Sequence, residues 1–436
     1  MNRVPCLTYL VVTSAWLHSH VDAGTGIILN QKYGGIMHKF IRAYDDQPTI
    51  PANDNRKRII STISELTPRL DPETLRVCAS ILASSIEPNR KVVAEEHGAG
   101  HIAGALSFLN GNDIAIARWT SDELADKLIP YFGKNAHYRG GRLVLQGVQS
   151  GDKVTIVDDV LDRGETLGTL MNLIEARGAT IDEIYVLAEK TYGGKSFGRA
   201  NLSGRNIKSL LTVEVGGRRS RVETANCRFT KYCDNPEIDV SENLLHSSYE
   251  GKDLVAITSP EGKEVQFMVV PLSEHYPSTQ ADLLRETAFK IGQYIPRAQI
   301  DKIVSEFDRC SHILGAVSLY TNMSIAGAKW FPGPESQGTA FSMEYYKGNL
   351  YPYGIQRGDT VYIIEDTVSS GGTLIGLINL LRNNDVYIEG AVSAVEKKEY
   401  RGIHRIREET GINVHKILDV SIAGDKTQVT YDRHST

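Results

Sequence analysis

An internal duplication constrains this 436-residue chain more than any other feature of its sequence. Residues 147–190 read GVQSGDKVTIVDDVLDRGETLGTLMNLIEARGATIDEIYVLAEK, and residues 354–397 read GIQRGDTVYIIEDTVSSGGTLIGLINLLRNNDVYIEGAVSAVEK. The two segments align without a gap, and roughly a third of their positions are identical. Farther upstream, GHIAGALS at 100–107 matches SHILGAVS at 311–318. The pattern predicts two copies of one long unit rather than a solenoid of short repeats.

Each copy alternates apolar strands with helices. In the first copy we expect strands at 91–95, 113–118, 153–157 and 183–189, and helices at 102–109 and 167–177. Strands that are apolar throughout are typical of a parallel sheet covered on both faces. The sequence therefore predicts an α/β protein of two fused units, each a mainly parallel sheet with helices on both faces. In such sheets, ligands bind at the carboxyl ends of the strands.

The repeat also suggests how the chain is divided. We expect an N-terminal extension at 1–50, a first unit at 51–215, a connector at 216–250 and a second unit at 251–436. Residues 254–272 read as a hairpin that forms a hood over the second unit. Nothing before about Met37 matches the repeat, so we expect that segment to be dispensable. A secretory signal ending near Ala23 is the alternative, because residues 7–17 are largely apolar.

Composition narrows the class of protein. The net charge of −5 disfavours a general electrostatic grip on DNA. The five cysteines are scattered, with no standard zinc spacing, so we expect free thiols in a reducing compartment. No segment is apolar for long enough to predict a membrane-spanning helix. We therefore expect a cytoplasmic protein without a DNA or membrane partner.

Two adjacent acids, Asp158 and Asp159, follow the apolar run at 153–157, and a glycine-containing loop follows them. Free N–H groups and the helix dipole at the start of the next helix make an anion site, around which Gly164 lets the backbone close. Thr166 is expected to cap this helix and to donate to a phosphate oxygen. Carboxylates are natural acceptors for neighbouring hydroxyls. The combination indicates a site for a 5-phosphorylated ribose.

The second copy repeats this arrangement with Glu365 and Asp366. Its loop has no acidic side chain and is the cleaner phosphate site of the two. The loop residues are Ser369, Ser370, Gly371, Gly372 and Thr373.

The stretches VTIVDDVLDRGET and VYIIEDTVSSGGT resemble the signature of type I phosphoribosyltransferases, and the resemblance covers roughly 300 residues. It implies transfer of a 5-phosphoribosyl group from phosphoribosyl pyrophosphate (PRPP) to a purine-type base, as in purine salvage. The implied partners are PRPP and a nucleobase. The implied cofactor is Mg²⁺, which neutralises the pyrophosphate leaving group and would be held by Asp158 and Asp159.

The resemblance also implies roles for other residues of the first unit. Gly98 and Gly100 would let backbone amides approach the pyrophosphate, and Arg118 would supply a cation at the end of the second strand. Asp162 would handle a proton of the purine ring, and Lys190 would meet the purine oxygen. A mobile catalytic loop would lie within 120–147, with candidate cations at 134–142.

The second unit departs from the pattern, because it has neither glycine in its pyrophosphate loop and Ser369 in place of Asp162. We therefore expect the chemistry in the first unit, and a second site that favours a nucleotide over PRPP. We expect the units to pack as an intramolecular pseudo-dimer, with a homodimer as a further possibility. A non-catalytic regulator of the purine-repressor type is the main alternative, and a PRPP synthetase is a second one.

Overall fold

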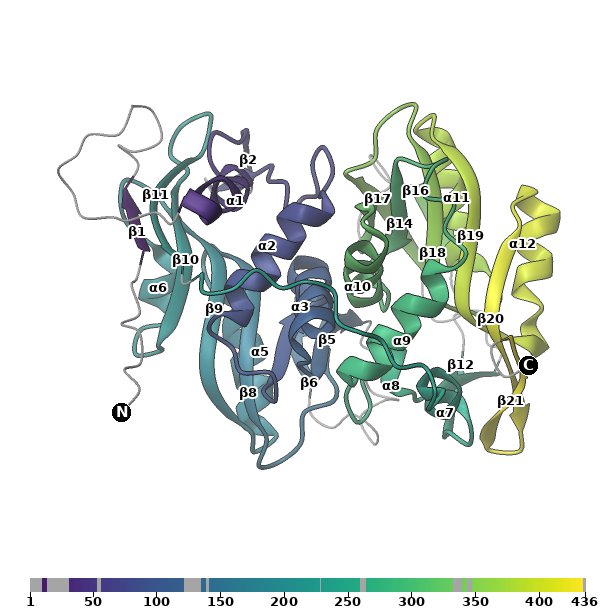
Figure 1. The fold of residues 1–436 in the computed structure, drawn as a ribbon. Coiled ribbons are helices and arrows are strands. Elements are labelled where there is room, and N and C mark those ends of the chain that lie inside the picture. The colour runs from purple at the N-terminus through teal and green to yellow at the C-terminus, as the bar shows by residue number, and fades with distance from the viewer. Residues whose placement is uncertain are drawn as a thin grey trace.

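Each half of the chain folds around its own sheet, and helices pack between the two sheets (Figure 1). The computed structural model describes residues 10–13, 31–52, 56–120, 135–138, 141–227, 229–258, 264–331, 339–342 and 347–433. After the first sheet the chain crosses the molecule to the second, where it begins the other unit (Figure 1). The sequence prediction of two α/β units is confirmed.

The first unit is built on one large mixed sheet. Its strands are β1 (Leu10–Thr13), β4 (Lys91–Glu95), β5 (Ile114–Thr120), β6 (Asn135–Tyr138), β7 (Gly141–Leu145), β8 (Lys153–Leu161), β9 (Thr180–Thr191), β10 (Ile207–Glu214) and β11 (Arg221–Cys227). Within the described residues their order is β1-β11-β10-β9-β8-β4-β5-β7-β6. The middle of the sheet, from β10 to β5, is parallel, and the strands at both edges are antiparallel to their neighbours.

The second unit repeats this topology. Its strands are β14 (Lys302–Glu306), β15 (Ser324–Phe331), β16 (Thr339–Ser342), β17 (Lys347–Tyr353), β18 (Thr360–Val368), β19 (Tyr387–Lys397), β20 (Val414–Ala423) and β21 (Lys426–Asp432). The order β16-β17-β15-β14-β18-β19-β20-β21 matches the first sheet strand for strand, apart from β1. Each unit also has a short two-stranded hairpin outside its main sheet. The hairpins are β2 (Thr49–Pro51) with β3 (Lys57–Ile59), and β12 (Leu254–Thr258) with β13 (Glu264–Met268).

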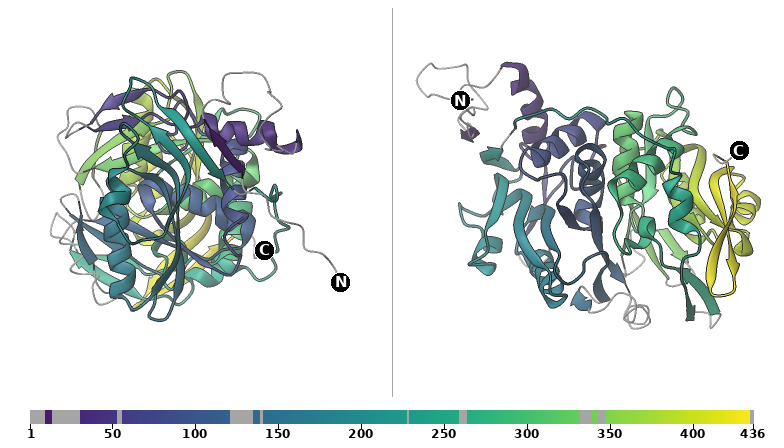
Figure 2. Two further views of the ribbon diagram at one scale, coloured as in Figure 1. Left: turned by 90° about the vertical axis from the view of Figure 1, so that its left-hand side faces the viewer. Right: turned by 60° about the horizontal axis from the view of Figure 1, so that its bottom comes forward.

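Helices cover both faces of each sheet. They are α1 (Gln31–Arg42), α2 (Pro72–Ala83), α3 (Glu96–Asn110), α5 (Glu165–Ala176), α6 (Phe197–Asn201), α7 (Leu244–Tyr249), α8 (Pro271–Glu274), α9 (Ala281–Gly292), α10 (Ser311–Thr321), α11 (Gly372–Asn383) and α12 (Gly402–Thr410). Apolar residues of α5 and α11 pack on the outer faces of the first and second sheets. Helices α2, α3, α9 and α10 lie between the sheets, as Figures 1 and 2 both show.

The predicted elements match the observed ones except at their ends. Strand β8 continues through Asp158 and Asp159 to Leu161, so the two acids lie in the last part of the strand rather than in a loop after it. Helix α3 begins at Glu96, directly after β4, because the Glu95 side chain accepts the Gly98 N–H and caps the helix. The hood hairpin of the second unit forms as expected, and its turn lies outside the described residues.

The repeated unit begins earlier than the sequence match indicated. Tyr44 Oη lies 3.1 Å from Ser64 Oγ, and in the second unit Tyr249 Oη lies 3.2 Å from Ser273 Oγ. The side chain of Phe40 is also fully buried. The structure thus differs from the expected boundary at residue 50, because apolar residues between Met37 and Tyr44 pack into the core of the first unit. Strand β11 likewise extends the first sheet into the range expected to be a connector.

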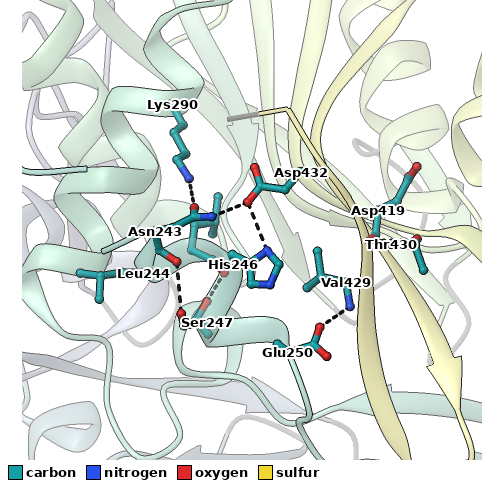
Figure 3. Close-up of polar contacts among 12 residues, drawn as sticks. Asn243, Leu244, His246, Ser247, Glu250, Lys290, Asp419, Val429, Thr430 and Asp432 are labelled. Carbon is teal, nitrogen blue, oxygen red and sulfur yellow. Dashed lines mark hydrogen bonds and ion pairs between the residues drawn. The ribbon is translucent and has the colours of Figure 1, made fainter. Parts of the chain in front are cut away.

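A polar network anchors the start of the second unit (Figure 3). Asn243 Nδ2 donates to Asp432 Oδ2 at 2.7 Å, and His246 Nδ1 lies 3.2 Å from the same oxygen. Lys290 on α9 donates to the Asn243 amide oxygen and pairs with Glu286 at 2.9 Å. These contacts tie α7 to both α9 and β21, which fixes Tyr249 at the end of α7 near the second site.

The two units share a continuous core. The largest apolar cluster contains residues of α2 and α3 together with residues of α9 and α10. A Cβ atom on Gly104 would lie 2.0 Å from the His312 carbonyl oxygen, and one on Gly315 would lie 2.1 Å from the His101 carbonyl oxygen. Both glycines are therefore required for the close approach of α3 to α10. Such an apolar, tightly packed contact is typical of obligate interfaces.

Two tryptophans extend this contact at its edge. The rings of Trp119 and Trp330 pack together with centroids 4.5 Å apart. Four of the cysteines lie in the described residues, where all four are buried and free. No helix in the described part of the chain has the length and hydropathy needed to cross a membrane.

Candidate active site

The first unit contains a cavity of about 480 Å³ at the carboxyl ends of its parallel strands. Its walls come from the ends of β4 and β8, the first turn of α5, the hairpin strand β3 and, from the second unit, Lys329. The acids Asp158 and Asp159 lie on one side of the cavity, and Asp162 with Lys190 lies on another. The cavity therefore collects most of the first-unit residues that the sequence singled out.

The acidic pair is poorly compensated by its surroundings. Asp158 is buried and accepts a hydrogen bond from the Asp159 N–H at 3.0 Å. Burial, together with the charges of Asp159 and Glu95, raises the pKa of Asp158 well above its usual value. Burial also raises the pKa of Asp159, and the nearby ammonium group of Lys329 opposes that rise. A ligand that offers hydroxyl donors or a cation to these oxygens would relieve the repulsion.

The loop after β8 is shaped to receive an anion. Gly164 has a φ of +79°, the left-handed region that favours glycine, and a Cβ there would meet Leu202 at 2.6 Å. Helix α5 begins at Glu165 with Gly164 as its N-cap. The sequence predicted that Thr166 caps this helix, but Thr166 is the second residue of the helix and Gly164 is the cap. The first backbone N–H groups of α5 point to the loop, where they can bind a phosphate oxygen.

The far end of the cavity holds a charge pair. Lys190 Nζ lies 3.2 Å from Asp162 Oδ2 and donates to the Lys57 carbonyl oxygen at 2.9 Å. Tyr192 Oη donates to Asp162 Oδ1 at 3.3 Å. The Lys57 carbonyl and the Tyr192 hydroxyl hold the Lys190 ammonium and the Asp162 carboxylate in place. The cavity wall thus presents one hydrogen-bond donor next to one acceptor.

The two glycines of the predicted pyrophosphate loop have different positions. Gly98 lines the cavity, and a Cβ there would lie 2.8 Å from Asp159 Oδ1. Gly100 instead faces α10, where a Cβ would lie 2.1 Å from Ser311 Oγ. Only Gly98 thus leaves space beside the acids, and the expected role of Gly100 at the site is corrected to a role in packing the two units.

Two basic side chains, Lys329 and Arg118, each reach from their own unit to the site of the other unit. Lys329 on β15 reaches the first cavity, donates to the Ser64 carbonyl oxygen at 3.0 Å and lies 4.5 Å from the centre of the Tyr353 ring. Arg118 on β5 does the reverse and forms a buried ion pair with Glu274 beside the second cavity. The predicted role of Arg118 in the first site is thus contradicted by its position, and Lys329 occupies that place instead.

The second unit has a cavity of only about 60 Å³ at the equivalent position. Glu365 and Asp366 are buried on its wall, and Oε2 of Glu365 and Oδ2 of Asp366 have no hydrogen-bond partner among the described residues. Lys397, the counterpart of Lys190, donates to the Gln266 carbonyl oxygen at 2.8 Å. The predicted loop residues line this cavity together: Ser369, Ser370, Gly371, Gly372 and Thr373.

The donor set of the first cavity suits a magnesium ion that also binds the ligand. Mg²⁺ prefers carboxylate oxygens and is commonly held by one or two of them together with substrate phosphates. Asp158 and Asp159 offer two such groups, and burial raises the pKa of both carboxyls. Among the described residues no group of three or more His, Cys, Asp or Glu side chains is placed to hold a metal.

Several further site residues were not predicted. Arg58 forms hydrogen bonds of 2.7 and 2.6 Å with the Glu65 carboxylate and donates to Tyr353 Oη at 2.8 Å. These residues, with Ser64 and Tyr192, precede the matched blocks or carry no motif, so the repeat gave no signal for them. Most of the predicted mobile loop, including Lys134 and Arg139, lies outside the described residues.

Comparison with known proteins finds single-unit relatives. The chain is 30% identical over 168 residues to a hypoxanthine/guanine phosphoribosyltransferase of Methanocaldococcus infernus, covering 38% of this chain and 91% of that protein. It is 29% identical over 170 residues to the protein of that name from Methanopyrus kandleri, covering 38% and 89%. No family model matches the chain.

Among solved structures, the chain is similar to the adenine phosphoribosyltransferase of Rhodothermus marinus. That likeness has a TM-score of 0.33 at 18% identity and covers 41% of this chain and 97% of that one.

Proposed function

The chain belongs to the type I phosphoribosyltransferase family, and we propose that its first unit transfers a 5-phosphoribosyl group from PRPP to a purine-type base with release of pyrophosphate. The observation that carries this proposal is the single cavity that joins an acidic pair, a phosphate loop and the Asp162–Lys190 pair. A phosphorylated ribose needs the first two features, and a purine base needs the third.

The acids and the loop bind the phosphoribosyl group. Asp158 and Asp159 accept hydrogen bonds from the ribose hydroxyls, and the backbone N–H groups after Gly164 bind the 5-phosphate. The space above Gly98 admits the pyrophosphate, and Lys329 places a positive charge next to it. The displacement at the anomeric carbon passes through a cation-like state, which the neighbouring carboxylates stabilise electrostatically.

The Asp162–Lys190 pair recognises the base. The Asp162 carboxylate holds or removes the proton of a purine ring nitrogen, and the Lys190 ammonium donates to an exocyclic oxygen. A 6-oxopurine offers both groups, whereas adenine offers a donor where Lys190 requires an acceptor. Within the proposed reaction, the base is therefore of the hypoxanthine or guanine type.

Magnesium would be held by Asp158 and Asp159 together with oxygens of the ligand. When bound, it would neutralise charge on the pyrophosphate leaving group. We also propose the cytoplasm as the site of action, because PRPP and nucleobases are intracellular metabolites. A homodimer of the fused chain, in addition to the contact between its two units, remains a proposal.

The division of the chain follows from the paired tyrosines. We propose a first unit from about residue 37 to residue 227 and a second unit from about residue 243 to the end, since Tyr44 and Tyr249 occupy matching places. A regulator of the purine-repressor type is less favoured, because the relatives with full-length coverage carry enzyme names and the first site keeps its acid and its lysine.

The direct test is incubation of the full chain with PRPP, Mg²⁺ and a panel of bases, with pyrophosphate release as the readout. We expect release with hypoxanthine or guanine, and at least tenfold less with adenine or orotate. Absence of release with every base, in a protein that still binds PRPP, would favour the regulatory alternative.

A further inference from the structure

The wall of the second cavity carries an aromatic ring where the first has a charged side chain. Lys190 and Lys397 donate to the carbonyl oxygens of Lys57 and Gln266, so Arg58 and Phe267 are the next residues in matching strands. Arg58 is bound to Glu65 at the edge of the first cavity. Phe267 is 1% exposed and lines the second cavity. This exchange contributes to the difference between cavities of about 480 and 60 Å³.

The turn that would receive a pyrophosphate is also filled. Counting from the matched histidines His101 and His312, Arg309 stands where the first unit has Gly98. Its φ of +71° is the left-handed value that favours glycine. Its N–H donates to the Glu96 carboxylate of the first unit, and its Nε lies 3.3 Å from Glu274 Oε1.

The guanidinium of Arg309 also lies 5.1 Å from the centre of the Phe267 ring. Both the backbone donor and the side chain of this turn are therefore engaged by protein groups. A second phosphate group would have to displace them.

The part of the site that binds a single phosphate is intact. Gly371 has a φ of +82° and is the N-cap of α11, a twelve-residue helix. The loop has no acidic side chain, in contrast to Asp162 and Glu165 of the first unit. On the facing wall, one oxygen each of Glu365 and Asp366 is buried without a hydrogen-bond partner in the part of the chain that the structure describes. These atoms are acceptors that lack donors, as a ribose diol would supply.

We propose that the second unit is a separate, non-catalytic site for a 5-phosphorylated riboside without a pyrophosphate group, such as a nucleoside 5′-monophosphate or ribose 5-phosphate. The ribose assignment rests on the proposed function of the matching loop in the first unit. The exclusion of PRPP rests independently on Arg309 and Phe267. The chain thus holds one substrate site and one site for a product-like ligand.

Calorimetry on the full chain tests this proposal, with GMP, ribose 5-phosphate and PRPP as probes. In the unmodified protein we expect one PRPP per chain but two GMP per chain. In the Asp158→Asn/Asp159→Asn variant, which neutralises the first site, we expect one GMP to remain and PRPP to bind at least tenfold more weakly than GMP. Ribose 5-phosphate bound as tightly as GMP would assign recognition to the sugar phosphate, and tighter GMP would add a contribution from the base.

Two further variants make the test sharper. Ser370→Glu places a negative charge in the loop and should weaken GMP binding to the neutralised protein at least tenfold. Arg309→Gly/Phe267→Arg restores the residues of the first unit and should raise PRPP affinity at the second site at least tenfold. No GMP or ribose 5-phosphate bound by the neutralised protein, or PRPP bound there as tightly as GMP, would overturn the proposal. Pyrophosphate release by the unmodified protein reports separately on the first site.

Discussion

The two sites have matching strands and loops, but they differ in the side chains that occupy the space beside the acids. The first has Gly98 and an arginine held by Glu65, and its cavity is open. The second has Arg309 and a buried phenylalanine, and its cavity is about an eighth as large, since 60/480 is 0.125. The phosphate loop is kept in both. Under the two proposals above, the features that bind a phosphoribosyl group and those that allow its transfer are separable in this fold.

The largest difference between the two sites is expected in the rate of pyrophosphate release after the acidic pair of each site is neutralised. Asp158→Asn/Asp159→Asn removes two charge-assisted hydrogen bonds to the ribose, and at about 1.5–3 kcal/mol each this lowers pyrophosphate release roughly 1000-fold. The matched change Glu365→Gln/Asp366→Asn should lower it by less than about tenfold, because no step occurs there. Steady-state assays compare the two variants. The reverse ranking would move the catalytic site to the second unit.

The second-largest effect is expected from removing the Asp162 carboxylate, which faces the proposed position of the base. Asp162→Asn should lower kcat roughly 100-fold, the usual contribution of a general acid–base group, and leave PRPP affinity nearly unchanged. Ser369→Ala, at the matching place, is the control and should stay within about twofold of the parent protein. If Asp162→Asn kept more than a third of the activity, the base would be recognised by other groups.

The crossing cation gives a smaller effect that depends on both units. Lys329→Met keeps the length of the side chain but removes the charge, and should raise KM for PRPP about tenfold, as expected for one hydrogen bond to a charged group. Arg118→Met should act on stability instead, because the buried Glu274 carboxylate loses one of its two ion-pair partners and keeps only Arg309. Kinetics and thermal melting of both variants distinguish the roles. A change of KM in Arg118→Met alone would contradict the assignment.

The smallest expected effect concerns the ligand-free second site. Burial and the charge of Asp366 raise the pKa of Glu365 above 4.5, so its ionised form costs folding free energy at neutral pH. Glu365→Gln should therefore stabilise the protein by about 1 kcal/mol at pH 8. The gain should shrink as the pH falls through the raised pKa and vanish below pH 4.5, where the carboxyl is protonated in both the folded and the unfolded state.

Urea unfolding at several pH values measures this difference. Glu237→Gln on the exposed surface is the control and should show no such gain. A gain for Glu365→Gln that grew toward acid pH would have the wrong sign for a carboxyl with a raised pKa.

The duplication allowed much of this architecture to be predicted, because apolar strands and the acidic loop recur at a fixed spacing. Self-comparison shows which residues correspond, but it does not show which unit a side chain faces. Arg118 was therefore predicted in the first site but lies beside the second cavity, and the role of Lys329 in the first cavity was not predicted. Tyr44 and Tyr249 were missed because the difference in residue number between matching positions changes upstream of β4 and β14. The alignment of the two copies therefore breaks there.

The contact between α3 and α10 has a consequence for how such a protein can evolve. Glu96 of one helix reaches the turn of the other unit, and its counterpart there is Phe307, which packs near His101. In an assembly of two identical subunits, every substitution at this position would alter both sites at once. A single gene that encodes both units allows selection to change the residue on one side of the contact and to keep the residue on the other side. Under the proposals above, the fusion allows one copy to lose catalysis while the shared core keeps it folded next to the catalytic copy.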